Sequence, residues 1–216
     1  MSAATVTENG EILLSVAGLE LWRGERHLLR GISLELGAGE LLQVTGANGV
    51  GKTSLLRVVS GLMPAESGEV SWRGRSIRVH REDFCAEFAY LAHSNALKAD
   101  LTSIENLLYE SALRRTISRV QCLQVLTELG VAQCADLAVR LLSAGQRRRV
   151  AFARVILCAA KLWILDEPTT NLDAKGIQLV DAALQTHVAT GGAVLVAAHH
   201  ALLANHHCRR QFELSA

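Results

Sequence analysis

Short runs of apolar or alternating residues mark the first 45 positions of the chain. They cover residues 12–16, 19–22, 32–36 and 41–44, and glycines separate them. Runs of this length, bounded by glycine, are typical of strands that are joined by turns. The pattern predicts a small sheet that leads into a strand at 41–44, and a glycine-rich loop follows this strand.

The spacing of apolar residues changes further along the chain. A short helix is expected at 54–59, then a strand at 67–72 with Gly68 as a turn residue, and then an apolar strand between 84 and 92. From 101 to 142, Leu, Ile and Val recur at helical spacing. This stretch predicts a group of helices between two strands.

A start signal precedes these helices. Thr102 and Glu105 match the capping-box pattern, in which each side chain bonds to the other residue's backbone N–H group. We therefore expect a helical subdomain inserted at about 94–143. The length of 216 residues suits one sizeable domain, spanning 1–216, better than two independent ones.

Helices and strands alternate again after the inserted subdomain. The expected elements are a helix at 144–158, a strand at 162–165, a helix at 174–189 and a strand at 194–197. Apolar strands flanked by helices are typical of a parallel sheet that is covered on both faces. The expected fold class is α/β.

The loop after the run 41–44 matches the phosphate-binding pattern G-x-x-x-x-G-K-[ST] between a strand and a helix. Glycines let backbone N–H groups face a phosphate, and the helix start adds unpaired amides and a positive dipole end. Lys52 would reach the β- and γ-phosphates, and the Thr53 hydroxyl would be a ligand of Mg²⁺. The candidate nucleotide-binding residues here are Gly46, Ala47, Asn48, Gly49, Val50, Gly51, Lys52, Thr53 and Ser54.

Two carboxylates, Asp166 and Glu167, end the apolar run 162–165. A buried charge is costly unless a metal or a partner compensates it. Asp166 fits a Mg²⁺ ligand, usually through water, because Mg²⁺ keeps much of its hydration. Glu167 fits the base that orients the attacking water in phosphoryl transfer.

A second candidate anion site precedes the helix 144–158. Ser143 supplies a hydroxyl and Gly145 a backbone amide at the positive end of this helix, and Gln146 completes the motif. Three arginines follow at 147–149, which could suggest nucleic acid. We expect them to be charges on the helix surface and to make contacts within the protein, because the chain as a whole is not basic.

Composition restricts the partners and the compartment. The 22 basic and 21 acidic residues give a net charge of +1, so no whole-molecule field favours nucleic acid or an anionic membrane. The five cysteines are odd in number and form no C-x-x-C pair, which fits reduced thiols in the cytoplasm. We see no signal peptide in residues 1–10, and the apolar runs fall short of the roughly 18 to 20 residues that span a bilayer.

Taken in order, these motifs resemble the ATP-binding-cassette (ABC) ATPases along nearly the whole chain. The resemblance covers the phosphate loop, the sequence L-S-x-G-Q at 142–146, the two carboxylates, the segment 168–173 and a strand that leads to His199. It implies a P-loop NTPase core of the RecA-like kind, with an N-terminal antiparallel β subdomain and the inserted helical subdomain. It also implies an ATPase that uses ATP and Mg²⁺.

The resemblance implies a dimer as well. In this family the serine loop of one subunit faces the γ-phosphate bound to another, so two copies would close head to tail around ATP. The segment 171–173, with Asp173, would cross that interface, and His199 would be the switch histidine that contacts the γ-phosphate. Trp22 would stack on the adenine ring; its place on a strand alone is equally compatible with core packing.

One position departs from the family pattern. His93 stands where most of these ATPases carry Gln. An imidazole can still hydrogen-bond a water or the metal's shell, but its ring is rigid and its charge changes near neutral pH. Either the site couples differently or His93 marks a subfamily. We count it with Glu167 and His199 among the candidate catalytic residues.

The residues around His93 carry a finer resemblance. The sequence at 90–93, followed by 97–102 and 105–107, resembles the ATP-binding subunits of the bacterial haem exporters of cytochrome c maturation. This implies integral membrane subunits as partners and a peripheral place on the cytoplasmic face of the inner membrane. ATP hydrolysis would drive haem export or release of a haem chaperone.

Other functions remain open at this point. The chain could be the ATPase subunit of another small-substrate ABC transporter, or a soluble ABC protein acting on nucleic acid or ribosomes, although such proteins usually carry two cassettes or long insertions. A simple P-loop kinase or GTPase would leave 142–146 unexplained. Haem or Zn ligation by the cluster His199, His200, His206, His207 and Cys208 is chemically possible. The spacing matches no closed metal motif, so we expect a solvated or interface tail there instead.

Overall fold

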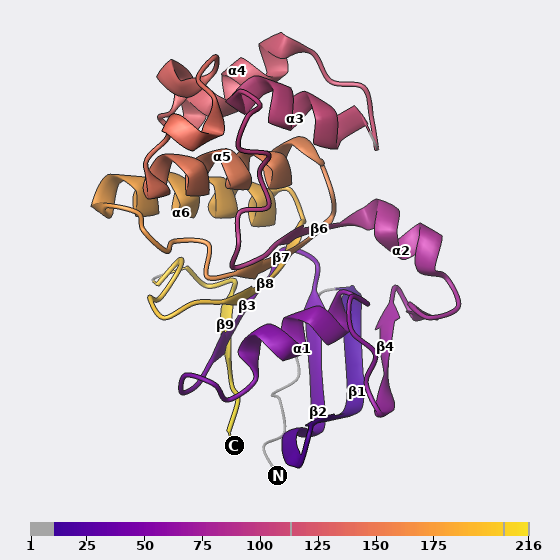
Figure 1. Cartoon of the computed structure of the whole chain (residues 1–216). Helices are drawn as coiled ribbons and strands as arrows, with labels where there is room; N and C mark the ends of the chain where they lie inside the picture. Colours follow the sequence, from indigo (N-terminus) through magenta and orange to yellow (C-terminus); the bar gives the residue numbers. More distant parts are fainter. Residues whose placement is uncertain (1–10, 113, 205, 216) are drawn as a thin grey trace.

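The computed structural model describes residues 11–112, 114–204 and 206–215. Its strands form two sheets (Figure 1). The first is antiparallel, with strand order β2-β1-β4-β5, and the second is parallel, with order β6-β7-β8-β3-β9. The strands are β1 (Ile12–Arg23), β2 (Arg26–Gly37), β3 (Leu41–Thr45), β4 (Ser67–Trp72), β5 (Arg75–Ser76), β6 (Phe88–Leu91), β7 (Leu162–Asp166), β8 (Ala193–Ala197) and β9 (Arg209–Glu213).

Helices cover both faces of the parallel sheet. In Figure 1, α5 and α6 lie on one face, α1 and the antiparallel sheet lie on the other, and α3 and α4 lie beyond α5. The expected fold class, α/β with an antiparallel and a parallel sheet, is confirmed. The helices are α1 (Lys52–Val59), α2 (Arg81–Glu87), α3 (Ser103–Ala112), α4 (Arg119–Glu128), α5 (Ala144–Leu157) and α6 (Ala174–Ala189), with short 3₁₀ turns at Ala132–Cys134 and Val139–Leu141.

The parallel sheet separates two hydrophobic cores. Along β7, Trp163 and Leu165 pack into the core beneath α5 and α6, while Leu162 and Ile164 pack into the core beneath α1 and the antiparallel sheet. Because successive side chains of a strand point to opposite faces, an uninterrupted apolar run is what a strand buried on both faces requires. The prediction of a parallel sheet covered on both faces is confirmed.

Some expected boundaries were wrong in the first half of the chain. The runs 12–16 and 19–22 form one strand, β1, whose register with β2 and β4 shifts near Gly18. The run 41–44, expected as the strand before the phosphate loop, is β3 of the parallel sheet. Gly68 lies inside β4, where a Cβ would collide with the Gly18 backbone, so it is not a turn residue. A bulge therefore replaces two of the expected turns.

Two further segments also differ from expectation. Residues 84–87 complete α2 before β6 begins at Phe88. In the expected tail, His199, His200 and His207 are exposed, but Cys208 is buried. The strand β9, which we did not expect, follows Cys208 and pairs with β3. Its polar sequence hid it, because an edge strand does not need a continuous apolar run. Residues 1–10, where we expected no signal peptide, lie outside the described residues.

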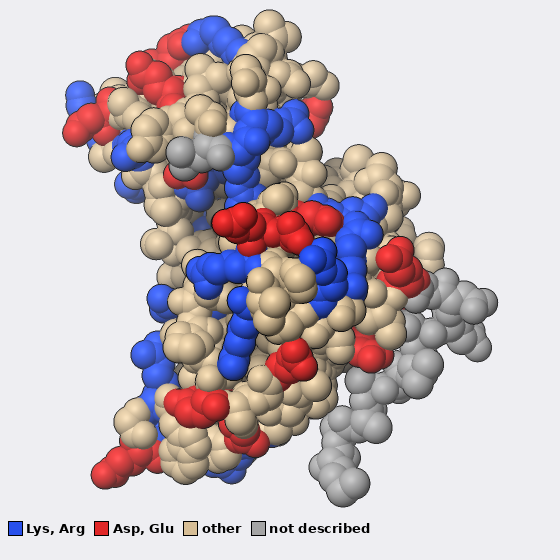
Figure 2. All heavy atoms as spheres, turned by 90° about the vertical axis from the view of Figure 1, so that its right-hand side faces the viewer, with Lys and Arg blue, Asp and Glu red and all other residues tan. Residues whose placement is uncertain are grey.

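The surface charges are mixed. On the face of Figure 2, which includes α2 and β4, acidic and basic side chains lie next to one another. Ion pairs join Arg75 to Asp83 and Arg73 to Glu87. None of the helices in the described part of the chain combines the length and the apolar character that a bilayer crossing needs.

Candidate nucleotide-binding site

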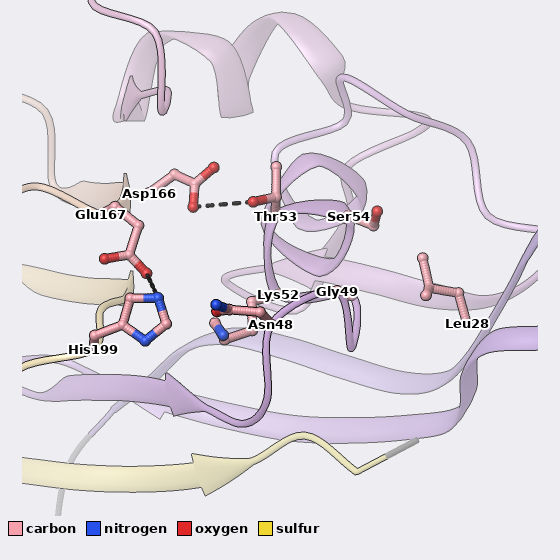
Figure 3. Close-up of a pocket in the computed structure, with 10 residues that line it drawn as sticks. Leu28, Asn48, Gly49, Lys52, Thr53, Ser54, Asp166, Glu167 and His199 are labelled. Atoms are coloured by element: carbon pink, nitrogen blue, oxygen red, sulfur yellow. Dashed lines mark hydrogen bonds and ion pairs between the residues drawn. The ribbon is translucent and has the colours of Figure 1, made fainter. Parts of the chain in front are cut away.

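A cavity of about 340 Å³ opens at the carboxyl end of the parallel sheet (Figure 3). The strands β3, β7 and β8 all end here, because they run parallel. Open α/β sheets bind ligands at this edge. The lining residues are Leu28, Asn48, Gly49, Gly51, Lys52, Thr53, Ser54, Asp166, Glu167 and His199.

The phosphate loop is shaped between β3 and α1. At Gly46, φ is +136° and a Cβ would run into the carbonyl oxygen of Leu214, so only glycine fits. Lys52 is 9% exposed, and its Nζ donates to the carbonyl oxygens of Gly46 at 2.7 Å and Ala47 at 3.2 Å. The ammonium group is thus folded over the loop, at the mouth of the cavity.

The start of α1 suits an anion. The N-cap residue is Gly51, and no side chain caps this end. The amides of the first turn therefore have no side-chain acceptor, as a helix-end phosphate site requires. Asn48 and Ser54 line the cavity with Lys52 and Thr53, whereas Val50 is buried in the core beneath the loop.

Asp166 has the surroundings of a cation ligand. Asp166 is 2% exposed, and its Oδ1 accepts a hydrogen bond of 3.2 Å from Thr53 Oγ1. Within the described residues, the buried Oδ2 has no hydrogen-bond partner. A carboxylate with one free oxygen beside a hydroxyl is a donor set that Mg²⁺ accepts. Burial, and secondly the charge of Asp166, raise the pKa of Tyr90 to about 12.

Glu167 is held in an unusual backbone conformation. Its φ is +52°, and its N–H donates to the carbonyl oxygen of Ala197 at 2.8 Å. The side chain points into the cavity (Figure 3), and Oε1 lies 3.4 Å from Nε2 of the exposed His199. A non-glycine residue at positive φ needs support from its surroundings, and such residues cluster at functional sites.

A buried amide fixes the loop that carries His199. Gln43, in the middle of β3, is 1% exposed. Its Nε2 donates to the carbonyl oxygens of Ala198 at 3.0 Å and His200 at 2.9 Å, one on each side of His199. Sequence analysis missed Gln43, although a polar residue within an apolar run was the available signal.

The residues of the second candidate anion site lie apart from the cavity. Ser143 caps α5: its Oγ accepts from Gln146 N at 3.2 Å, and Gln146 Oε1 accepts from Ser143 N at 2.8 Å. A Cβ at Gly145 would lie 2.7 Å from the carbonyl oxygen of Asn171. Asp173 caps α6 by accepting from Gly176 N at 2.8 Å. None of these described residues lines the cavity.

Two further candidates also lie outside the lining. Trp22 is 47% exposed and stacks on His27 with ring centroids 4.3 Å apart, so the core-packing alternative is wrong. His93 is exposed after β6, where its carbonyl oxygen accepts from Arg148 Nη1 at 3.4 Å. Of the two roles expected for residues 147–149, Arg147 is exposed on the helix surface, whereas Arg148 is 2% exposed and makes contacts within the protein.

Comparison with known proteins agrees with this geometry. The sequence profile of the ABC transporter family matches residues 29–170. The ATP-binding subunit of an ABC transporter superposes with a TM-score of 0.82 at 23% identity, over 94% of this chain and 88% of that one. The structure of cbiO1 from Clostridium perfringens, part of the ABC transporter complex cbiONQ, has a TM-score of 0.72 at 25% identity, covering 88% and 79% of the two chains.

Curated relatives cover almost the entire chain. The cytochrome c biogenesis ATP-binding export protein of Methylococcus capsulatus is 47% identical over 91% of this chain and 95% of its own length. The protein of the same description from Dechloromonas aromatica is 43% identical, over 87% and 92%. The one from Vibrio cholerae is 38% identical, over 94% and 98%.

The chain belongs to the ABC transporter family of ATP-binding proteins and is an ABC-type ATPase. Within that family it groups with the cytochrome c biogenesis ATP-binding export proteins. Both resemblances stated from the sequence are confirmed.

Proposed function

We propose that this chain is the ATP-hydrolysing subunit of a membrane ABC complex for cytochrome c biogenesis. The observation that carries the proposal is the cavity in which Lys52, Glu167 and His199 converge at one sheet edge. The identity to the cytochrome c biogenesis proteins supports the cellular role. Hydrolysis would be coupled to haem export or to release of a haem chaperone.

The phosphate loop binds the nucleotide in this proposal. The amides of 46–54 and the start of α1 hold the β- and γ-phosphates. Lys52 leaves the loop carbonyls that it contacts now and moves to the phosphates, a charge-assisted interaction. Trp22, already flat against His27, offers its exposed ring to the adenine.

Residues at the ends of β7 and β8 would carry out the hydrolysis. Glu167 accepts the proton of the attacking water as the new bond to the γ-phosphorus forms and the bond to ADP breaks. His199, 3.4 Å from Glu167, contacts the γ-phosphate. Thr53 and the free oxygen of Asp166 would hold Mg²⁺. When bound, this ion neutralises charge on the phosphates.

The site is completed by a second copy of the chain in this proposal. Ser143, Gly145 and Gln146 lie outside the cavity of their own chain, as expected of residues that face the nucleotide of another copy. The segment 171–173, which includes Asp173, lies beside the start of α5, because Gly145 packs against the Asn171 carbonyl. The proposed assembly is a homodimer with ATP bound between the two subunits.

The remaining expectations fit the same scheme. The chain forms a single ABC ATPase domain over 1–216, with the helical subdomain inserted at about 94–143. His93 lies between this subdomain and the core, where it would respond to bound nucleotide. Integral membrane subunits are the partners, and the chain sits peripherally on the cytoplasmic face of the bacterial inner membrane. Nucleic acid is not among its partners.

The substitution Glu167→Gln tests the catalytic part of the proposal. Loss of a general base typically lowers a rate by about 10²–10⁴-fold, so steady-state ATP turnover should fall by this much while nucleotide binding survives. Glu25→Gln, at an exposed turn between β1 and β2, is the matched control. Unchanged turnover in Glu167→Gln would exclude the role given to Glu167.

The cellular role has a separate test. In the host bacterium, the chromosomal gene is replaced by the Glu167→Gln variant, and covalently bound haem is stained after denaturing electrophoresis. We expect the c-type cytochromes to disappear, while proteins that hold haem without a covalent bond keep their absorbance. Normal c-type cytochromes with an inactive ATPase would contradict the role in cytochrome c biogenesis but not the ATPase chemistry.

A further inference from the structure

A buried arginine lies directly behind the two carboxylates of the site. Arg148, in the second turn of α5, is 2% exposed. A buried guanidinium is costly unless its five N–H groups find acceptors. Here the acceptors are backbone oxygens and one amide side chain rather than a carboxylate.

The contacts of Arg148 fall into two groups. Toward the end of β7, Nη2 donates to the carbonyl oxygens of Asp166 at 2.5 Å and Glu167 at 2.8 Å, and Nε donates to that of Pro168 at 3.3 Å. Toward the segment after β6, Nη1 donates to the carbonyl oxygens of Ala92 at 2.8 Å and His93 at 3.4 Å, and to Asn95 Oδ1 at 3.0 Å. One guanidinium thus joins three parts of the chain.

A second arginine of α5 holds the same segment. Arg154 Nη1 donates to the carbonyl oxygens of Asn95 at 3.3 Å and Ala96 at 2.9 Å, and lies 3.7 Å from Glu110 Oε1 on α3. The segment 92–96 is the path from the sheet into α3. This segment is therefore fixed to α5 at both ends. Of these two arginines, Arg148 also contacts the end of β7.

The position of Glu167 depends on such contacts. Its backbone, at positive φ, is held on one side by the bond from its N–H to Ala197 O and on the other by Arg148 at its carbonyl oxygen. Burial lowers the pKa of Arg148 to about 10, and the charges of Asp166 and Glu167 oppose this shift. Arg148 therefore stays charged at neutral pH and gives the carboxylates a fixed positive neighbour.

We propose that Arg148 is a positioning residue for ATP hydrolysis. Its guanidinium fixes the backbone of Asp166 and Glu167 against α5 and the segment 92–95, so that a displacement of that segment reaches Glu167. The proposal rests on the role proposed above for Glu167. Lysine cannot replace Arg148 fully, because an ammonium group has three donors on a flexible stem and no planar fork.

The test compares Arg148→Met and Arg148→Lys with Arg147→Met. Arg147 is the neighbouring arginine on the same helix and is exposed, and its side chain has no hydrogen bond in the described part of the chain. Displacing a reacting group by about 1 Å can cost about 10²-fold in rate. We expect Arg148→Met to lower kcat by about 10- to 100-fold with ATP affinity within a few-fold, and Arg147→Met to match the wild type.

The split between kcat and ATP affinity separates positioning from a general loss of structure. A general loss of structure lowers ATP affinity together with kcat, whereas a displaced Glu167 lowers kcat alone. Arg148→Lys restores the charge but not the planar fork, so its kcat should lie between those of Arg148→Met and the wild type. A kcat within twofold of wild type for a folded Arg148→Met, or an ATP affinity that falls as much as kcat, would overturn the proposal.

A milder variant covers the case in which Arg148→Met does not fold. Asn95→Ala removes one acceptor of Arg148 and leaves its charge in place. It should lower kcat by a few-fold while ATP affinity stays unchanged. It should add little in the Arg148→Lys background, whereas full additivity there would count against the link. If Glu167→Gln keeps its turnover, the proposed function fails; if Glu167→Gln is inactive and Arg148→Met is not impaired, only the positioning role fails.

Discussion

The phosphate loop and the start of α5 both present a helix N-terminus, but they are built in opposite ways. At the phosphate loop Gly51 is the N-cap and no side chain closes the helix, so its amides face a cavity. At α5, Ser143 and Gln146 close the helix with a capping box, and the start is exposed. In the described part of the chain, the first end has no side-chain acceptor for its amides, whereas the second is capped within its own chain.

In the homodimer proposed above, this difference would assign the two sides of one nucleotide site to two copies of the chain. The first region is shaped to hold a nucleotide on its own, with Lys52 and Asp166 buried around the cavity. At the start of α5, one side of Gly145 is covered, because its backbone packs against Asn171. Only the groups on the other side could contact a nucleotide. The Ser143 oxygen accepts from Gln146 N, and its O–H is left to donate. A monomer should therefore bind ATP and hydrolyse it poorly.

The largest effect is expected from breaking the first region. Lys52→Ala removes the buried ammonium group that would meet the phosphates, and losing one member of such a charged pair costs about 2–5 kcal/mol of binding. ATP affinity, measured by titration calorimetry on the isolated chain, should fall by the corresponding factor. Lys175→Ala, exposed in the first turn of α6, is the control. Equal affinities in the two variants would mean that Lys52 does not contact the phosphates.

A change of pH tests the stability of the fold separately from the phosphate loop and the start of α5, because it acts on His187, which belongs to neither region. The ring of His187 stacks on that of Trp163, with the ring centroids 3.9 Å apart. Burial lowers the pKa of His187 to about 4. Between pH 6.5, the ordinary pKa of histidine in the unfolded chain, and pH 4, His187 binds a proton in the unfolded chain but not in the folded chain. The free energy of unfolding should therefore fall as pH drops through this range, by up to about 3 kcal/mol, and should be unaffected above it.

Urea unfolding at pH 7 and pH 4.5 measures this effect, with His187→Gln as the comparison. The variant should lose stability at pH 7 through the lost stacking, but its further loss on acidification should be smaller than in the wild type. An identical decrease in both proteins would assign the acid sensitivity to other groups. Activity profiles of the site are best measured above pH 6.5, where this contribution is absent.

The smallest effect is on stability, and it separates two similar caps. Ser118 and Ser143 both close capping boxes with a Gln at the third helical position. Replacing either by Ala should cost about 1 kcal/mol of stability, which thermal unfolding can measure. Ser143→Ala should also lower ATP turnover, whereas Ser118→Ala should not. If both variants hydrolyse ATP equally well, the start of α5 is only a helix cap.

The parts that could be predicted from the sequence are those encoded locally. The phosphate loop, the carboxylates after β7 and the Ser143 cap each depend on a few consecutive residues and on the strand or helix beside them. The two-faced burial of the parallel sheet also followed from apolar runs such as 162–165.

The parts that could not be predicted depend on which segments meet. Arg148 looks like its exposed neighbour Arg147 until the ends of β6 and β7 are placed beside it. Gln43 acquires its role from the loop after β8, and β9 is recognised as a strand only through its pairing with β3. Burial of a polar residue is a property of the assembled fold, so spacing along the chain does not reveal it.

The order of strands in the parallel sheet has a consequence for synthesis on the ribosome. The phosphate-loop strand β3 is made early, but both of its neighbours, β8 and β9, come from the last quarter of the chain. Until β8 has emerged, β3 has two open edges, and until β9 has emerged it keeps one. Pairings of such long sequence separation form slowly. The nucleotide site is therefore among the last parts of the protein to assemble, and the nascent chain exposes an apolar strand to chaperones for most of its synthesis.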